Sequence, residues 1–329
     1  MPPPPDGPRV VCVGGGHGMY ASLSALRRVT PHLTAVVTVA DDGGSSGRLR
    51  QELGVLPPGD LRMALAALAG HEPAGRLWAR LLQHRFGGYG ALAGHPVGNL
   101  ALSGLVEMLG DPVAALDALA STVGAVGRVL PASPMPLEIV ADVASVDPDD
   151  PHRQRRIRGQ VAVAATPGRV LAVHLVPESP PACAAAVDAV RAADWVVFGP
   201  GSWFTSVLPH LLVPDLRKAL VRTRARRLVV LNLAPQPGET DGFAPQTHLD
   251  VLRQHAPGLR LDVVLADRAA VPDTDGLGRA ARSMGARLVL GDVAAADGTP
   301  RHDAAKLAGA YAQVLKGEAR YGDDRGGQG

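Results

Sequence analysis

The stretch "VVCVGGGHGMYASL", Val10 to Leu23, decides the fold, because an apolar run passes through four glycines directly into a helical pattern. The β-branched run at 9–13 predicts a buried strand, and the apolar spacing at 19–29 predicts an amphipathic helix. The glycines between them form a strand-to-helix turn, whose free backbone N–H groups and helix dipole attract an anion, most often a phosphate. The alternative is a tight turn that only needs positive φ angles.

Two phosphate-binding patterns can be compared with this turn. The segment "GHGMYA" at 16–21 fits the G-x-G-x-x-A pattern of dinucleotide folds, and Asp41 follows the next predicted strand, where a ribose-binding acid stands in such folds. The pattern is short, so a nicotinamide-dependent oxidoreductase is the weakest of our hypotheses. Neither glycine-rich loop contains G-x-x-x-x-G-K-[ST], which excludes a Walker A phosphate loop.

Composition limits the class of protein. A chain of 329 residues is long enough for one large α/β domain, and 33 basic against 31 acidic side chains give a net charge of +2. That charge is no signature of a nucleic-acid or membrane-surface protein. The two cysteines, Cys12 and Cys183, lie in no metal or disulfide motif. No apolar run approaches a membrane span, so we expect a cytoplasmic protein with a small-molecule partner.

Strand and helix patterns alternate along most of the chain, which predicts an α/β, Rossmann-like, doubly wound and mostly parallel sheet. We expect one domain at 9–316, with a helical insertion at about 46–125 and a small β-rich excursion at about 137–176. A leader at 1–8 and a tail at 317–329 are expected to be disordered. Besides 9–13, the parallel strands are expected at 33–39, 195–198, 227–233, 262–266 and 286–290, and helices at 46–53, 60–69, 74–84, 97–109, 112–122, 181–192, 204–223, 245–256, 276–284 and 303–316, with breaks near Pro209 and Pro214.

Four loops that follow predicted strands are rich in glycine and polar groups: "GGGHG", "ADDGGSSGRLR", "GPGSWFTS" and "PQPGETDG". In open α/β sheets the ligand lies at the carboxyl ends of the strands, so these loops are expected to bind one ligand together. The predicted ligand-binding residues, with Asn99 from "GHPVGNL", are Gly14, Gly15, Gly16, His17, Gly18, Asp41, Asp42, Gly43, Gly44, Ser45, Ser46, Asn99, Gly199, Pro200, Gly201, Ser202, Thr205, Asn232, Gln236, Glu239 and Thr240.

Several of these residues have alternative roles. Asp41 and Asp42 could accept hydrogen bonds from a nucleoside or cap the following helix, and Asp42 is also a candidate Mg²⁺ ligand. Asp60 in "LPPGDLR" is interpreted as an ordinary helix cap. No local motif of the Ser/His/Asp or Cys/His kind assigns catalytic residues. Valine at Gly15 or Gly201 is expected to abolish phosphate binding and leave the fold intact.

Six motifs in this order, "GGGHG", "TAVVTVADDGGSSGRLR", "LPPGDLR", "GHPVGNL", "GPGSWFTSVLPHLLVP" and "NLAPQPGETDGF", resemble those of the YvcK-like, or gluconeogenesis factor, family. The resemblance runs from about Val10 to Asp267. It implies a fold similar to that of the 2-phospho-L-lactate transferases of coenzyme F420 synthesis. It also implies a regulator of bacterial cell shape, peptidoglycan synthesis and carbon metabolism that binds UDP-N-acetylglucosamine or a related UDP-sugar.

Two classes of function therefore stand beside each other. The first is a UDP-sugar sensor, which can be a homo-oligomer and can act on a cell-wall or regulatory protein partner. The second is a Mg²⁺-dependent transferase of a phosphate-bearing group. Aromatic residues make up 3% of the chain, so a flavin-like acceptor would find few stacking partners beyond Tyr20, Trp195, Trp203 and Phe204. This scarcity favours the regulator.

Overall fold

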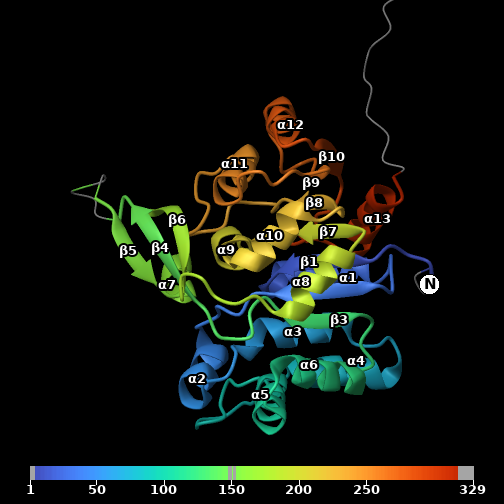
Figure 1. Cartoon of the computed structure of the whole chain (residues 1–329), viewed down its shortest axis with the longest axis vertical. Coiled ribbons are helices and arrows are strands. Elements are labelled where there is room, and N and C mark those ends of the chain that lie inside the picture. Colours follow the sequence, from blue (N-terminus) through green and yellow to red (C-terminus); the bar gives the residue numbers. More distant parts are fainter. Residues whose placement is uncertain (1–3, 147–149, 151–152, 318–329) are drawn as a thin grey trace, which may run out of the picture.

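A seven-stranded parallel sheet forms the centre of the molecule (Figure 1). The computed structural model describes residues 4–146, 150 and 153–317. The strands lie in the order β10-β9-β8-β7-β1-β2-β3, and every pairing between neighbours is parallel. Their bounds are β1 (Val10–Gly14), β2 (Leu33–Val37), β3 (Arg128–Pro131), β7 (Trp195–Phe198), β8 (Arg226–Val230), β9 (Val263–Asp267) and β10 (Arg287–Gly291). The predicted α/β doubly wound class is confirmed.

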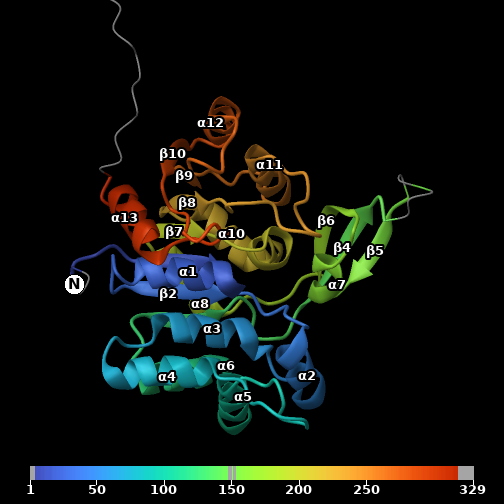
Figure 2. The same cartoon turned by 180° about the vertical axis from the view of Figure 1, so that it is seen from behind.

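Helices cover both faces of this sheet, which is why its central strands are apolar throughout (Figures 1 and 2). On one face lie α1 (Gly16–Leu26) and α13 (Ala304–Leu315), which pack against each other. On the other lie α8 (Ala184–Ala192) and α10 (Pro214–Arg222). The helices near the β9–β10 edge are α11 (Pro245–His255) and α12 (Thr274–Ser283).

The helical insertion lies between β2 and β3 and packs below α1 in both views. Its helices are α2 (Gly44–Leu53), α3 (Pro58–Leu68), α4 (Pro73–Gln83), α5 (Val97–Leu109) and α6 (Pro112–Thr122). Helix α3 lies against α1, β2 and β3, and so connects the insertion to the sheet. Sequence analysis missed β3, because its four residues lie between Gly127 and a proline-rich segment and lack a long β-branched run.

The β-rich excursion is a separate antiparallel sheet with the order β5-β4-β6, formed by β4 (Glu138–Ala144), β5 (Arg155–Arg158) and β6 (Arg169–Val176). The connection predicted at its tip lies largely outside the described residues. Within the region predicted as β-rich, the short helix α7 (Gln160–Ala164) separates β5 from β6, and sequence analysis did not predict this helix. Helix α7 contacts η1 (Trp203–Val207), a π-helical turn that follows β7 of the main sheet.

Two further boundaries differ from the prediction. Helix α1 begins at Gly16 rather than at Met19, so two of the four glycines belong to the helix and only Gly15 serves as its N-cap. The helix expected at 204–223 consists of η1, α9 (Pro209–Leu212) and α10, and its breaks lie at the two prolines as predicted. Glycine in the first helical turn therefore concealed the start of α1 from the apolar pattern.

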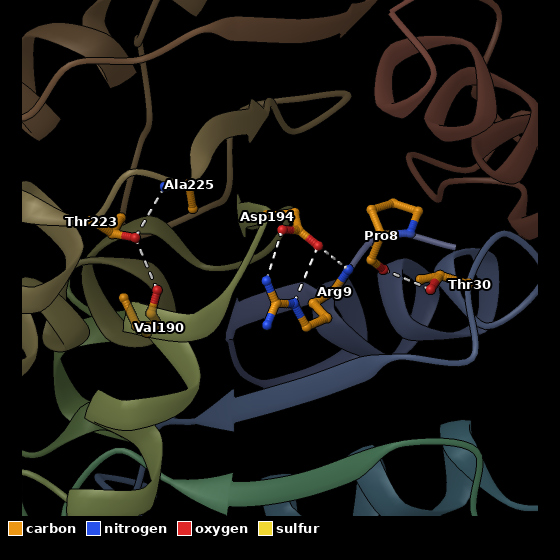
Figure 3. A network of polar contacts seen from close by, with 7 residues as sticks. All are labelled: Pro8, Arg9, Thr30, Val190, Asp194, Thr223 and Ala225. Carbon is orange, nitrogen blue, oxygen red and sulfur yellow. Dashed lines mark hydrogen bonds and ion pairs between the residues drawn. The ribbon is translucent and has the colours of Figure 1, made fainter. Parts of the chain in front are cut away.

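The amino-terminal ends of the strands are held together by paired polar groups (Figure 3). Asp194, just before β7, accepts hydrogen bonds from the backbone and the guanidinium of Arg9, just before β1. The hydroxyl of Thr223 donates to the Val190 carbonyl and accepts from the Ala225 N–H, just before β8. A cavity of about 240 Å³ opens at this edge, beside the starts of β1, β2 and β3.

The two ends of the chain can be described only in part. Residues 1–3 of the predicted leader lie outside the described residues, whereas the carbonyls of Pro5 and Pro8 contact the side chains of His32 and Thr30. The predicted tail is outside the description from residue 318 onward. In the described segments, every helix is too short or too polar to cross a bilayer.

Candidate functional site

The loops after β1 and β7 meet at the point where the strand order reverses. Strand β1 has β2 on one side and β7 on the other, so the carboxyl ends of β1 and β7 flank the crevice in which open α/β sheets bind ligands. An ideal Cβ on Gly18 would lie 2.3 Å from the Pro200 carbonyl oxygen and 2.5 Å from the Gly201 Cα. Any side chain at residue 18 would therefore separate the two loops, which form one continuous backbone surface.

The start of α1 offers free donors on this surface. Gly16 has a φ of +60° and no protein atom within 4 Å of its ideal Cβ position, so its outer side is open. The N-cap, Gly15, provides no side-chain hydrogen bond to the helix, and the next residue, His17, is exposed. Uncapped N–H groups at a helix start, together with the helix dipole, favour an anionic ligand.

Asp60 lies directly beneath this first loop. An ideal Cβ on Gly15 would lie 2.5 Å from Asp60 Oδ2 and 2.7 Å from Thr38 Cγ2. The expectation that valine at Gly15 leaves the fold intact is therefore wrong, because the added side chain would clash with the protein itself. The interpretation of Asp60 as a helix cap is also wrong, since Pro57 is the N-cap of α3 and Asp60 lies inside its first turn.

One carboxyl oxygen of Asp60 has no hydrogen-bond partner, although the backbone of Gly16 forms a hydrogen bond with this carboxyl. Its Oδ2 is buried and accepts no hydrogen bond from the described residues. Burial, reinforced by the negative charge of Asp41, raises the pKa of Asp60 to about 7. The two neighbouring carboxyls therefore favour the protonated form of Asp60, which removes one negative charge from beneath the first loop. Sequence patterns gave no signal for this residue beyond its stiff Pro-Pro-Gly approach.

The two consecutive aspartates after β2 face different parts of the molecule. Asp41 Oδ1 accepts a hydrogen bond from Gly43 N at 2.9 Å, and its Oδ2 would lie 2.8 Å from a Cβ on Gly59 in α3. Asp42 Oδ1 instead accepts from Val161 N at 3.0 Å, at the start of α7. Asp42 thus connects this loop to the antiparallel excursion and does not cap α2, whose N-cap is Gly43.

A second group of predicted residues supports the loop after β7. The amide of Asn232 brackets Gly201, accepting from its N–H at 2.9 Å and donating to its carbonyl at 2.8 Å. The same amide donates to Gln236 Oε1 at 3.1 Å, so both of its N–H groups are used within the protein. The hydroxyl of Thr240 accepts from Gln236 N at 2.7 Å and fixes the next turn. These contacts assign a loop-supporting role to the Asn232 amide.

Glu239 closes the same group from the other side. Its carboxylate accepts hydrogen bonds from the hydroxyls of Ser202 and Thr205, the latter at 2.8 Å, and from Phe204 N at 3.2 Å. It therefore supplies the acceptor that the start of η1 lacks, because Ser202 itself makes no capping bond to the helix backbone. With Glu239 buried, the shape of the second glycine loop depends on this carboxylate.

A third group extends from the loop after β2 into the insertion. Arg62 Nε donates to Asn99 Oδ1 at 2.9 Å, and Asn99 Nδ2 donates to Ser45 Oγ at 2.9 Å. Ser45 Oγ lies within hydrogen-bond distance of His95 Nδ1, at 2.7 Å, and burial lowers the pKa of His95, which favours its neutral ring. Ser46 Oγ accepts from Gly59 N at 3.0 Å and holds α2 against α3.

Most of the predicted residues thus lie at one edge of the sheet, which we call the carboxyl rim: the loops 15–18, 38–43, 199–202 and 231–240. Four others lie on the helices α2, α5 and η1: Ser45, Ser46, Asn99 and Thr205. Gly14, Gly44 and Pro200 lie at the ends of strands or at helix starts on this rim. Within the described residues, no group of three or more His, Cys, Asp or Glu side chains has the spacing of a metal site. Asp42 as a Mg²⁺ ligand stays a prediction, and so does ligand binding by the rim residues.

Comparisons with known proteins agree with this architecture. Residues 10–299 match the family model described as "2-phospho-L-lactate transferase CofD". The chain is 61% identical over 302 residues to a Mycobacterium tuberculosis protein named "Putative gluconeogenesis factor", covering 91% of this chain and 88% of that protein. It is 34% identical over 319 residues to the "Gluconeogenesis factor" of Listeria monocytogenes, covering 94% and 96%.

A solved structure has the same fold. The crystal structure of a UPF0052 family protein from Bacillus halodurans superposes with a TM-score of 0.82 at 33% sequence identity, covering 92% of this chain and 98% of that one. The family match covers residues 10–299, a range that includes all four loops of the carboxyl rim. The chain therefore belongs to the CofD family and, within it, to the UPF0052 group of gluconeogenesis factors.

Proposed function

We propose that this protein is a regulatory protein that binds UDP-N-acetylglucosamine or a related UDP-sugar at the carboxyl rim. The observation that carries the proposal is the direct contact between the loops after β1 and β7, which leaves no room for a side chain at Gly18. Two glycine loops joined at a topological switch point present backbone donors to a diphosphate from both sides. The names of the curated relatives support a role in carbon metabolism in general.

The nucleotide-sugar fits the polar groups that the rim leaves free. The diphosphate lies over the start of α1, and the half-buried carboxylate of Asp41 accepts hydrogen bonds from the ribose. Asn232 and Glu239 act indirectly, because their polar atoms hold the second loop in shape. Charge-assisted hydrogen bonds contribute roughly 1.5–3 kcal/mol each, so a few donors suffice for micromolar affinity after the cost of association.

Binding of this ligand is proposed to control cell shape and cell-wall synthesis through a change in the surface that meets a protein partner. The aromatic residues favour a regulator over an enzyme that transfers a group to a stacked, flavin-like acceptor. Trp195, Trp203 and Phe204 are buried in the core, which leaves Tyr20 as the one partly exposed residue of the four considered.

The second candidate is a Mg²⁺-dependent transferase of a phosphate-bearing group. It is favoured by the description of the matching family model and by the neighbouring carboxyls of Asp41 and Asp60 under the first glycine loop. In that case Asp42 would use its second oxygen for the metal, because its Oδ1 already accepts from Val161 N.

Thermal unfolding with different nucleotides tests the proposal. At one hundred times its dissociation constant a ligand stabilises the fold by about 2.7 kcal/mol, so UDP-N-acetylglucosamine is expected to raise the melting temperature by a few degrees. NAD is expected to raise it less, and a larger shift with NAD would contradict the proposal. Mass spectrometry of UDP-sugars incubated with protein and Mg²⁺ separates the two candidates, because only a transferase changes the mass of its substrate.

A further inference from the structure

Arg62 is a buried cation without an anionic partner. Its side chain stands in the second turn of α3, and the residue is 4% exposed. Nε donates to Asn99, but neither terminal nitrogen donates a hydrogen bond to any described residue, and no described carboxylate lies within ion-pair distance. Neither terminal nitrogen is fully enclosed by the protein, so both keep contact with solvent.

Arg227 shows one way in which this chain satisfies a buried guanidinium, whereas Arg27, at the end of α1, leaves Nε and Nη2 without a described partner. Arg227 is 8% exposed and lies on β8. It donates three hydrogen bonds, at 2.7–2.8 Å, to backbone carbonyls in the segment 220–223. Arg62 differs because neither of its terminal nitrogens donates to a described protein group, although the residue as a whole is 4% exposed.

The fold builds a slot for the Arg62 side chain. An ideal Cβ on Gly98 would lie 2.8 Å from Arg62 Cγ and 2.9 Å from its Cδ, so only glycine at 98 admits the stem. The next residue, Asn99, is 1% exposed and fixes Nε, while Ser45 and His95 hold the Asn99 amide in turn. The guanidinium is therefore oriented before any ligand arrives.

Hydrogen bonds through Asn99 connect Arg62 to Ser45, at the start of α2 and directly after the rim loop that follows β2. Burial, together with the repulsion of Arg85, lowers the pKa of Arg62 to about 10, and the charges of Asp60 and Asp41 act in the opposite direction. The guanidinium thus stays protonated at neutral pH. Of these two acids, Asp60 lies beneath Gly15 and Asp41 follows β2, so both adjoin the loops to which a phosphate would bind.

We propose that the guanidinium of Arg62 binds the ligand's diphosphate. Its two terminal nitrogens, which we call the fork, would each donate to one of a pair of diphosphate oxygens. The inference rests on the proposed function for the identity of the nucleotide, but the recognised group is the diphosphate itself. A planar guanidinium pairs with phosphate oxygens through two parallel hydrogen bonds, which the compact ammonium of lysine cannot reproduce. Asn99 is the positioning residue for this fork.

Calorimetric titration with inorganic pyrophosphate and, separately, with UDP-N-acetylglucosamine tests the fork. Arg62→Gln is expected to weaken the binding of both ligands by about tenfold or more, which corresponds to the loss of one charge-assisted pair of hydrogen bonds. Arg62→Lys keeps the charge but not the fork, so it should bind more weakly than the natural protein and more tightly than Arg62→Gln. Arg76→Gln removes the same charge from the exposed face of α4 and should bind like the natural protein.

A stability measurement distinguishes a ligand-binding fork from a structural arginine. Without ligand, Arg62→Gln should unfold at an unchanged or higher temperature, because it removes an unpaired buried charge. Pyrophosphate binding by Arg62→Gln or Arg62→Lys at natural affinity would overturn the proposal, as would a natural protein that does not bind pyrophosphate. A natural protein that binds pyrophosphate but not the UDP-sugar would contradict the proposed function and leave the fork in place.

Discussion

The two edges of the parallel sheet differ in what their polar groups do. At the amino-terminal edge the structure holds a cavity of about 240 Å³, yet the charged groups around it are paired, Arg9 with Asp194 and Arg128 with Asp117. At the carboxyl rim the fold leaves Asp60 Oδ2 without a partner and the fork of Arg62 unused. This cavity and the unused polar groups of Asp60 and Arg62 therefore lie at opposite edges of the sheet.

The difference follows from the direction of the strands. In a parallel sheet the helix that follows each strand starts at the carboxyl edge, so uncapped N–H groups and positive dipole ends gather there. At the amino-terminal edge the helices end, and the side chains just before the strands can pair with one another, as Arg9 and Asp194 do.

The largest effect is expected where the two glycine loops touch. Gly18→Ala would place a methyl group 2.3 Å from the Pro200 carbonyl oxygen, so the loops must move apart. We expect a loss of about 2–3 kcal/mol in the free energy of unfolding, typical of overpacking, together with loss of UDP-N-acetylglucosamine binding. Urea denaturation and calorimetric titration measure the two effects.

Gly104→Ala is the matched control, because Gly104 is also a helical glycine but is exposed on α5 with open space around it. That change is expected to stabilise the fold by about 0.5–1 kcal/mol through helix propensity alone and to leave binding unchanged. Equal effects at the two glycines would show that the contact between the loops does not matter.

A smaller effect, which depends on pH, is expected at Asp60. The ordinary carboxyl pKa of 3.8 is raised to about 7 in the fold, so between these values the unfolded chain releases the proton first. Stability therefore falls as the pH rises from about 4 to about 7 and changes no further above that. Asp60→Asn removes this penalty and should be more stable than the natural protein at pH 8 by on the order of 2 kcal/mol.

Urea denaturation of both proteins at pH 4, 6 and 8 checks this sign. The gap between the variant and the natural protein should be smallest at pH 4 and open toward pH 8. Buried histidines such as His210, whose pKa is lowered to about 4 by burial, affect both proteins alike and cancel in the difference. Parallel stability profiles would contradict a raised pKa at Asp60.

Much of the fold is readable from the sequence, because the parallel strands are buried on both faces and appear as short apolar runs between helical patterns. The prolines at 209 and 214 also marked helix breaks correctly. Strand β3 could not be read in this way, since its pairing with β2 depends on a distant partner rather than on local pattern. For the same reason helix α7 was hidden inside a stretch of strand-forming residues.

The candidate site was predicted as a set of loops, but not as a set of roles. Loop chemistry pointed to Asn232 and Glu239, yet only the contacts across 31 and 35 residues show that they shape the second glycine loop. Asp60 was interpreted as a helix cap and Arg62 was not assigned to the predicted site, because an acid in the first helical turn and an arginine in the second are ordinary in sequence. Their burial and missing partners are tertiary properties.

The smallest effect is expected at the amino-terminal edge, and it tests the other half of the comparison. Asp194→Asn removes the charge that pairs with Arg9 but keeps an oxygen that can accept from the Arg9 N–H. The two side chains are 46% and 62% exposed, so the pair should contribute less than about 1 kcal/mol and weaken further with salt. The hydrogen bond from Arg9 lowers the pKa of Asp194, so this stability is present at neutral pH and lost on acidification. UDP-N-acetylglucosamine should bind Asp194→Asn as it binds the natural protein, because the whole length of the sheet separates this residue from the carboxyl rim. A titration in which Asp194→Asn loses affinity would show that the two edges are coupled, and the division between a paired edge and a binding edge would then be wrong.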